Sequence, residues 1–284
     1  MMLVDLHTHS KASDGSMSPA ELVGHAADRG LSAIAITDHD TIDGVSEAVE
    51  EGIRRGIEVI PGLEISVDFE PEMHILGYFF NNGCHAIEPA LEELHRKRQE
   101  RNPKIIRKLR EMGFDITLEE AVKLAGGKVV GRPHIAAAMV QRGYVSNARE
   151  AFDNYLASGK PAFFKKDKLT PQQGIEMILR ADGVPVLAHP VLLGMENRRL
   201  DQLLGKLAAA GLKGAEAIYV ENSEEQTEFL IEMCRKHHLI VTGGSDFHGE
   251  FKPDIEIGTG KGNLRIPYQA VEELKLAAAE ASRR

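Results

Sequence analysis

Histidines and carboxylates gather in short clusters along this chain, and each cluster directly follows a short apolar run. Asp5-Leu-His-Thr-His opens the chain, Thr37-Asp-His-Asp follows Ala33-Ile-Ala-Ile, and Gly244-Ser-Asp-Phe-His follows Ile240-Val-Thr-Gly. In β/α proteins the side chains that do chemistry lie just after the strands, at one face of the fold. We therefore expect these side chains to meet in space as metal ligands. The set has ten members: His7, His9, Asp14, Asp38, His39, Glu64, His74, His189, Asp246 and His248.

Strand-like and helix-like segments alternate in both outer parts of the chain. A strand followed by a helix and then a second strand is typical of parallel sheets. So many strands with ligands at their ends favour a TIM-like α/β barrel over an open doubly wound sheet, which remains the alternative. We expect strands at about 2–6, 32–36, 58–60, 64–67, 73–79, 184–188, 215–220 and 239–242. We expect helices at about 18–29, 43–55, 171–182, 198–209, 223–237 and 267–281.

The middle of the chain does not show this alternation of strands and helices. Residues 84–170 show helix-like patterns at about 87–112, 118–124, 132–142 and 147–156, the first kinked or split at Pro103. We therefore predict a barrel domain from 1–83 and 171–284, with 84–170 as a helical insertion that caps the substrate. The insertion holds 17 Lys and Arg against 11 Asp and Glu, whereas the whole chain has a formal net charge of −9. A basic insertion suits an anionic substrate such as a phosphate ester, unless its helix surfaces are simply rich in Lys and Arg.

Bulk properties exclude several classes of protein. The negative net charge argues against a basic nucleic-acid coat. Cys84 and Cys234 are far apart and form no CxxC pair, so a disulfide scaffold is not expected and a reducing cytoplasm is the simplest setting. The first residues lack the basic and apolar regions of a signal peptide. No apolar run approaches the roughly 20 residues of a membrane span.

The first clusters contain residue types that bind metal ions, at spacings that allow them to bind the same ion. His7 and His9 are two apart on an extended segment, so both imidazoles face one side and can bind one ion. Asp38 is either a ligand or a support that orients a ligand histidine, and Asp40 is interpreted as a helix cap. Glu64 stands in an apolar strand, where a buried carboxylate is costly unless paired or metal-bound. The alternative for Glu64 is a solvent-facing position.

The later clusters extend the set. His74 alone is better explained as a core histidine than as a ligand, while His189 stands at a strand end before Pro190. Asp246 and His248 follow two glycines, which allow the backbone to approach an ion closely. Ten candidate ligands are too many for one ion, so we expect two or three divalent ions. Mixed nitrogen and oxygen ligands suit Zn, Mn or Fe. A hydroxide bridging such ions would attack a phosphate ester without a protein nucleophile. The sequence has no GxSxG, Walker A or HExxH motif.

These motifs resemble the PHP (polymerase and histidinol phosphatase) domain phosphoesterases. The matching elements are Asp5-Leu-His7-Thr-His9-Ser, Thr37-Asp38-His39-Asp40, Leu187-Ala-His189-Pro and Ser245-Asp246-Phe-His248, with Glu64 and His74 between the second and third. The resemblance implies a distorted (β/α)7 barrel with a trinuclear site. It assigns one ion to His7, His9, Glu64 and Asp246, a second to Glu64, His74 and His189, and a third to Asp14, His39 and His248. Many family members have His where Asp14 stands, which weakens nitrogen ligation of the third ion.

The insertion adds a narrower resemblance. Gly131-Arg132-Pro-His134-Ile-Ala resembles the Arg-x-His element of a subgroup with a small inserted domain. The segment Gly159-Lys160-Pro-Ala also resembles that subgroup. That subgroup includes phosphatases of nucleoside 3′,5′-bisphosphates and relatives that trim RNA from its 5′ end. The resemblance implies that Arg132, His134 and, more weakly, Lys160 bind a substrate phosphate. The alternative is a helix N-terminus with incidental charge.

The sequence therefore predicts a metal-dependent phosphoesterase. Its partner would be a small phosphorylated nucleotide or a short 5′-phosphorylated oligonucleotide, with no membrane and no obligate protein partner. Two alternatives remain at this point: a phosphatase of the histidinol-phosphate type, and a non-catalytic or proofreading PHP module that serves a DNA polymerase.

Overall fold

The structure is a computed structural model that describes residues 2–80, 82–126, 130–164 and 169–281. The chain forms two compact units. The barrel unit comprises residues 1–90 and 168–284, and the helical unit comprises residues 91–167. Among the helices of the described ranges, none is long and apolar enough to cross a bilayer.

The barrel unit is built on one eight-stranded sheet with the order β7-β6-β5-β4-β3-β2-β1-β8. The strands are β1 (Leu3–Asp5), β2 (Ala33–Ile36), β3 (Glu58–Val67), β4 (Met73–Tyr78), β5 (Val184–Leu187), β6 (Gly214–Tyr219), β7 (Ile240–Gly244) and β8 (Ile266–Pro267). The sheet curls almost into a closed barrel, because the Leu6 N–H beyond β1 donates to the Gly243 carbonyl of β7 at 3.2 Å. The prediction of a barrel-like α/β fold is confirmed, and the open doubly wound sheet is not what forms.

Strand direction departs from the prediction at β4. β1, β2 and β3 are mutually parallel, as are β5, β6 and β7, but β4 runs antiparallel to both β3 and β5. The segments expected as two strands at 58–60 and 64–67 are one strand, β3. Only residues 68–72 separate it from β4, and a parallel connection needs about a dozen or more residues, so a hairpin is the outcome. The two-residue strand β8, antiparallel to β1, was not expected.

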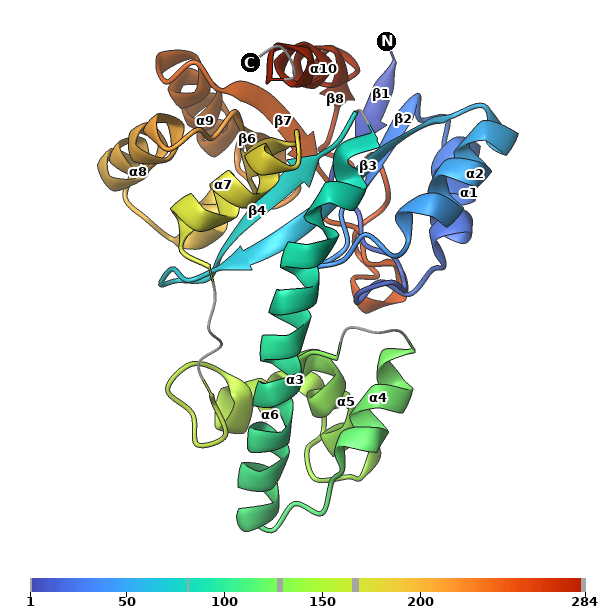
Figure 1. Ribbon diagram of the computed structural model, residues 1–284, viewed down its shortest axis with the longest axis vertical. Helices are drawn as coiled ribbons and strands as arrows, with labels where there is room; N and C mark the ends of the chain where they lie inside the picture. Colours follow the sequence, from blue (N-terminus) through green and yellow to red (C-terminus); the bar gives the residue numbers. More distant parts are fainter. Residues whose placement is uncertain (1, 81, 127–129, 165–168, 282–284) are drawn as a thin grey trace. The chain divides into compact units, whose positions relative to one another are not determined.

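Helices surround this sheet in Figure 1, with α1 (Pro19–Asp28) and α2 (Val45–Arg55) on one side. On the other side lie α7 (Pro171–Arg180), α8 (Asn197–Ala209) and α9 (Glu224–Lys236), and α10 (Gln269–Ala281) lies near the end where the chain begins. Capping boxes at Ser18, Thr170 and Ser223 start α1, α7 and α9, since each side chain accepts from the third helical N–H.

The interpretation of Asp40 as a helix cap is wrong. α2 begins at Val45 with Gly44 as its N-cap. Asp40 instead has a φ of 52° and donates its N–H to the Glu64 carbonyl at 2.8 Å. It therefore belongs to the segment between β2 and α2, which this bond connects to β3.

The barrel interior is apolar at the end covered by α10. Val4 of β1, Leu76 of β4 and Val186 of β5 are buried together with Val271 and Leu274 of α10. Because side chains alternate along a strand, these positions fill the interior while the residues after the strands are left to line the opposite end. α10 thus closes one end of the barrel, and polar side chains occupy the other.

The helical unit has its own core. α3 (Glu88–Glu111), which enters this unit at residue 91, continues through Pro103 as one helix, so of the two predicted alternatives, a kink or a split, the split does not occur. The N–H bond lost at proline is offset by burial of Ile105 and Leu109 against Ile135 and Met139. The remaining elements are α4 (Leu118–Ala125), α5 (Arg132–Gln141), α6 (Ala148–Ala151) and the π-helical turn η2 (Phe152–Leu156). Short 3-10 turns elsewhere are η1 (Asn82–Ile87), η3 (Pro190–Leu193) and η4 (Gly249–Phe251).

Candidate metal centre

The candidate ligands meet at the end of the barrel opposite α10. His7 and His9 follow β1, His39 follows β2, and His189 follows β5. His74 is the second residue of β4, and because β4 runs antiparallel, its beginning lies at the edge where the parallel strands finish. The Ala188 N–H donates to the His74 carbonyl at 3.2 Å, which sets His189 beside His74. The reversed strand thus brings a fifth imidazole to the group.

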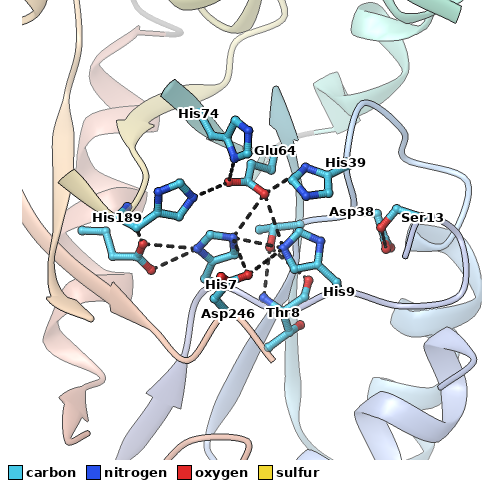
Figure 2. A network of polar contacts seen from close by, with 12 residues as sticks. His7, Thr8, His9, Ser13, Asp38, His39, Glu64, His74, His189 and Asp246 are labelled. Carbon is cyan, nitrogen blue, oxygen red and sulfur yellow. Dashed lines mark hydrogen bonds and ion pairs between the residues drawn. The ribbon is translucent and has the colours of Figure 1, made fainter. Parts of the chain in front are cut away.

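Glu64 of β3 stands at the centre of the group. Its Oε1 is 2.9 Å from His74 Nδ1 and 3.0 Å from His189 Nε2. Its Oε2 is 3.0 Å from His39 Nδ1 and 3.4 Å from the Nε2 atoms of both His7 and His9. Figure 2 shows these five imidazoles facing the one carboxylate. Glu64 is only 1% exposed, which excludes its solvent-facing alternative and suits a carboxylate that bridges two ions.

The ligand atoms form three overlapping groups, and within each group all atoms lie within 4.8 Å of one another. The groups are His7, His9 and Asp246; His39, Glu64 and His74; and His9, Asp14, His39 and His248. His9 and His39 each belong to two of them. The centre can therefore hold more than one cation, with shared ligands between neighbouring positions.

The chemistry of these donors fits divalent cations. The buried Nδ1 of His9 has no hydrogen-bond partner among the described residues, and it lies 3.6 Å from Asp14 Oδ1. The Nε2 atoms of His7 and His9 face each other at 3.1 Å. Two imidazole lone pairs directed at one point beside buried carboxylates are a costly arrangement, which a bound cation resolves. Mixed imidazole and carboxylate donors are those preferred by first-row metals.

Protonation differs sharply between two of the histidines. Burial, together with the neighbouring His248, lowers the pKa of His9 to about 3, so its ring is neutral at physiological pH. At His74 burial acts in the same direction, but the Glu64 carboxylate outweighs it and raises the pKa to about 10. A cation that binds at His74 must therefore displace a proton, whereas one that binds at His9 need not.

Two of the ligands adopt unusual backbone conformations. His189 has a φ of 27° and Asp246 has a φ of 54°, values that cost a non-glycine residue on the order of 1–3 kcal/mol. Hydrogen bonds hold both: the His189 N–H donates to Glu216 Oε2 at 2.7 Å, and the Asp246 N–H donates to the His7 carbonyl at 2.9 Å. The surrounding structure thus imposes the turns that aim these side chains inward.

Asp38 supports the centre through a loop. Its carboxylate accepts hydrogen bonds from the Ser10 N–H at 2.7 Å, the Ser10 hydroxyl at 2.7 Å and the Ser13 hydroxyl at 2.6 Å. These bonds shape the segment that carries His9 and Asp14. Asp38 therefore supports the loop that carries His9 and Asp14.

Glu216 is a functional residue that sequence reasoning missed. It is fully buried in β6, and its Oε1 lies 3.1 Å from His7 Nδ1. A carboxylate at this distance keeps a proton on Nδ1 and leaves Nε2 of His7 as the nitrogen that a cation could bind. The available signal was a charged residue inside the apolar run Gly214–Tyr219. Gly244 makes room for this pair, since a Cβ there would lie 2.2 Å from the Cβ of His7.

Asp5 is a second residue whose role was missed, although it stands in the first motif. Its buried carboxylate accepts hydrogen bonds from the Ser245 N–H at 2.9 Å, the Ser245 hydroxyl at 2.5 Å and the Gly258 N–H at 2.7 Å. Asp5 thereby ties the first motif to the last one, so that the ligands from both ends of the chain keep one arrangement.

A cavity of about 410 Å³ opens over the centre. It is lined by six of the candidate ligands, His39, Glu64, His74, His189, Asp246 and His248, together with Pro71, Glu72, Leu192 and Lys252. A cavity of this size accommodates a small phosphorylated molecule.

The candidate residues of the helical unit lie in two segments. Arg132 is the first residue of α5, where its Nη1 donates to the Leu156 carbonyl at 3.1 Å and its guanidinium lies 5.8 and 5.5 Å from the ring centroids of Phe152 and Phe163. His134 Nδ1 accepts a hydrogen bond from the Gly131 N–H at 3.0 Å. Lys160, in the segment after η2, is exposed. Arg132 is thus held against the segment 152–163.

Comparisons with known proteins agree on a family. The PHP domain model matches residues 5–274. The chain is 37% identical over 245 residues to a 5′-3′ exoribonuclease of Haemophilus influenzae, covering 86% of this chain and 89% of that protein. It is 30% identical over 260 residues to a 3′,5′-nucleoside bisphosphate phosphatase of Chromobacterium violaceum, covering 91% of each. The solved structure of an amidohydrolase from Chromobacterium violaceum, with bound sulfate and no metal, matches with a TM-score of 0.82, 29% identity and 96% coverage of each chain.

Proposed function

The chain belongs to the PHP domain family of phosphoesterases, and on that premise we propose that it removes the 3′-phosphate from nucleoside 3′,5′-bisphosphates. The observation that carries the proposal is the ring of five imidazoles around Glu64, beneath a cavity of about 410 Å³. A relative that acts on this substrate class matches along 91% of its own length.

The centre would hold two or three divalent ions, of Mn, Fe or Zn. His7, His9 and Asp246 would share one, Glu64 with His39, His74 and His189 another, and Asp14, His39 and His248 a third. Such ions supply Lewis acidity, which neutralises phosphate charge and lowers the pKa of water.

The protein's own residues prepare this site. The carboxylates of Asp14, Glu64 and Asp246 are concentrated in one place, where they would repel a phosphate dianion in the absence of cations. Glu216 and Asp38 hold the ligands in position from behind, through His7 and through the loop that contains Ser10. We therefore expect bound cations to strengthen the binding of phosphate at this site.

We further propose that Arg132 and His134 bind a phosphate group of the substrate. The guanidinium of Arg132 is planar and suits two oxygens of one phosphate, a geometry that lysine lacks. His134 accepts a backbone hydrogen bond at Nδ1, so its ring proton resides on Nε2, the arrangement that donates to an anion. Lys160 would add a longer-range positive charge. We propose that the protein works in a reducing compartment, the cytoplasm, because the buried residues Cys84 and Cys234 are not joined in a disulfide.

A second candidate activity is the removal of nucleotides from the 5′ end of short RNA. It is favoured by one observation, the 37% identity to a 5′-3′ exoribonuclease over 86% of this chain. The two activities share the same metal centre and differ in the bond that is cleaved, a monoester in one case and a diester in the other.

A substrate panel tests the proposal. Mn-loaded protein should release inorganic phosphate from a nucleoside 3′,5′-bisphosphate faster than from 5′-mononucleotides or histidinol phosphate. A 5′-phosphorylated oligoribonucleotide should yield mononucleotides if the second activity is present. Turnover of histidinol phosphate with no turnover of any nucleotide would overturn the proposed substrate class. Stable association with a DNA polymerase, combined with inactivity on the whole panel, would instead support the polymerase module.

A further inference from the structure

Lys252 faces the cavity over the metal centre, and nothing in the ligand set accounts for it. We propose that Lys252 is a substrate-binding residue whose ammonium group contacts the phosphate that is cleaved. This inference rests on the proposed phosphoesterase function and adds to it a protein cation next to the metal ligands.

The position of Lys252 is well defined by its neighbours. Its Nζ lies 2.6 Å from Asp246 Oδ2 and 3.5 Å from the Asp246 carbonyl, and its side chain is 36% exposed. It follows the turn η4, which is anchored because the Glu250 N–H donates to the Ser16 hydroxyl at 2.8 Å. Gly249 within that turn has a φ of 65° and contacts Ser16 so closely that a Cβ would lie 2.0 Å from its hydroxyl. The turn therefore holds the lysine at the cavity wall.

The two oxygens of Asp246 are divided between different partners. Oδ1 faces the imidazoles, 3.2 Å from His9 Nε2 and 3.6 Å from His7 Nε2. Oδ2 faces away from them and receives both Lys252 and the Tyr219 hydroxyl, the latter at 3.1 Å. Because Tyr219 already donates to Oδ2, orientation of the carboxylate does not depend on the lysine alone.

An ammonium group has three N–H donors, and Asp246 accounts for two of them here. Because Lys252 lines the cavity, the third N–H is available to a ligand that binds there. A cation at Oδ1 would draw negative charge from the same carboxylate and so weaken its hold on Lys252. A phosphate dianion in the cavity then becomes the stronger partner for the ammonium.

A purely structural role for Lys252 makes the opposite prediction for metal binding. If the lysine only oriented Asp246, its removal would lower metal occupancy. If it binds phosphate, removal takes a positive charge away from a carboxylate that binds cations, and metal affinity is maintained or increased. Metal content is therefore the measurement that separates the two roles.

The test compares Lys252→Met and Lys252→Arg with the control Lys236→Met. Lys236 is also a half-exposed lysine paired with an aspartate, 2.7 Å from Asp201 Oδ2, but it lies on α9 away from the ligand set. For each Mn-loaded protein we would measure bound metal, the dissociation constant of inorganic phosphate by calorimetry, and KM and kcat for p-nitrophenyl phosphate.

Lys252→Met should weaken phosphate binding about 10- to 100-fold at wild-type metal content, as expected for a lost hydrogen bond between charged groups. Lys252→Arg should recover most of that affinity, and Lys236→Met should match the wild type. Phosphate affinity unchanged in Lys252→Met, or reduced together with its metal content, would overturn the inference. If phosphate binding falls as expected while the wild type hydrolyses no nucleotide, the proposed substrates fail and the role of Lys252 stands.

Discussion

The barrel unit and the helical unit hold their candidate functional side chains in different ways. In the barrel unit both ring nitrogens of His7 are engaged, Nδ1 by Glu216 and Nε2 by the facing ligands, and the whole side chain is buried. In the helical unit Arg132 is half-buried, and its contacts include a hydrogen bond to the Leu156 carbonyl and the rings of Phe152 and Phe163. The first arrangement suits groups that must not move while they bind cations. The second suits a group that selects a ligand, so we expect substitutions in the two units to change different measurements.

The largest effect is expected from the central carboxylate. Glu64→Gln keeps the shape of the side chain but removes the charge that all five imidazoles face. Loss of a bridging ligand removes several kcal/mol of charge stabilisation, so kcat/KM should fall on the order of 10²- to 10⁴-fold. Metal analysis of the same sample should show at least one ion fewer. Full metal content with wild-type turnover would show that Glu64 is not a ligand.

A smaller effect is expected from Glu216, which contacts the candidate ligand His7 but is not itself in the ligand set. Glu216→Gln removes the charge that holds His7 and the backbone of His189, and metal affinity should fall about 10- to 100-fold. The change is measured by competition with a chelator. Glu221→Gln is the matched control, since Glu221 is a half-exposed glutamate paired with Lys261 on the surface. Equal metal affinity in both variants would contradict the role of Glu216.

The helical unit should respond in substrate binding alone. Arg132→Ala should raise KM for a nucleoside 3′,5′-bisphosphate about 10- to 100-fold while metal content stays at the wild-type value. Arg132→Lys should recover only part of the loss, because an ammonium lacks the two-pronged geometry of the guanidinium. Arg142→Ala, which removes an exposed arginine paired with Glu120 at the end of the same helix, serves as the control. Loss of metal in Arg132→Ala would contradict the proposal that the helical unit contributes to substrate binding alone.

The smallest effect concerns protons released within the metal centre. In the metal-free protein His74 is protonated up to its pKa of about 10, whereas His9 is neutral above about 3. Metal binding at His74 should therefore release a proton, and affinity should rise by up to about tenfold per unit as pH increases from 7 to 9. Calorimetry in two buffers with different ionisation enthalpies counts the protons. His74→Gln should reduce the number released, and an unchanged number would show that His74 is not displaced.

Most of the candidate ligand set was predictable because most of its members lie within a few residues of a recognisable strand. His7, His39 and His189 each follow an apolar run, and their common position after parallel strands is a local property of the sequence. Glu64 was predictable for another reason, since a carboxylate inside an apolar strand requires a partner. The capping boxes at Ser18 and Ser223 are equally local, and the predicted helices begin close to them.

Residues that depend on distant partners were not predictable in this way. Asp5 contacts Ser245, 240 positions away, and Glu216 contacts His7, 209 positions away, so neither role has a nearby signal. The pattern around His74 alone favours a core histidine, and only the family resemblance predicts a ligand there; the antiparallel course of β4 brings it to the edge where the other candidate ligands lie. Its role follows from strand direction, which the five-residue connection before it decides.

The sequence by itself determined which residues are available as ligands and that most of them follow strands, because strand patterns and ligand types are local. Only the tertiary structure decided which atoms face one another. In the folded chain one oxygen of Asp246 faces the imidazoles and the other contacts Lys252. Asp38 accepts hydrogen bonds from the loop that carries His9, and Glu216 contacts Nδ1 of His7. These choices arise from closure of the barrel, which brings β1 and β7 together and fixes side-chain directions that no local pattern records.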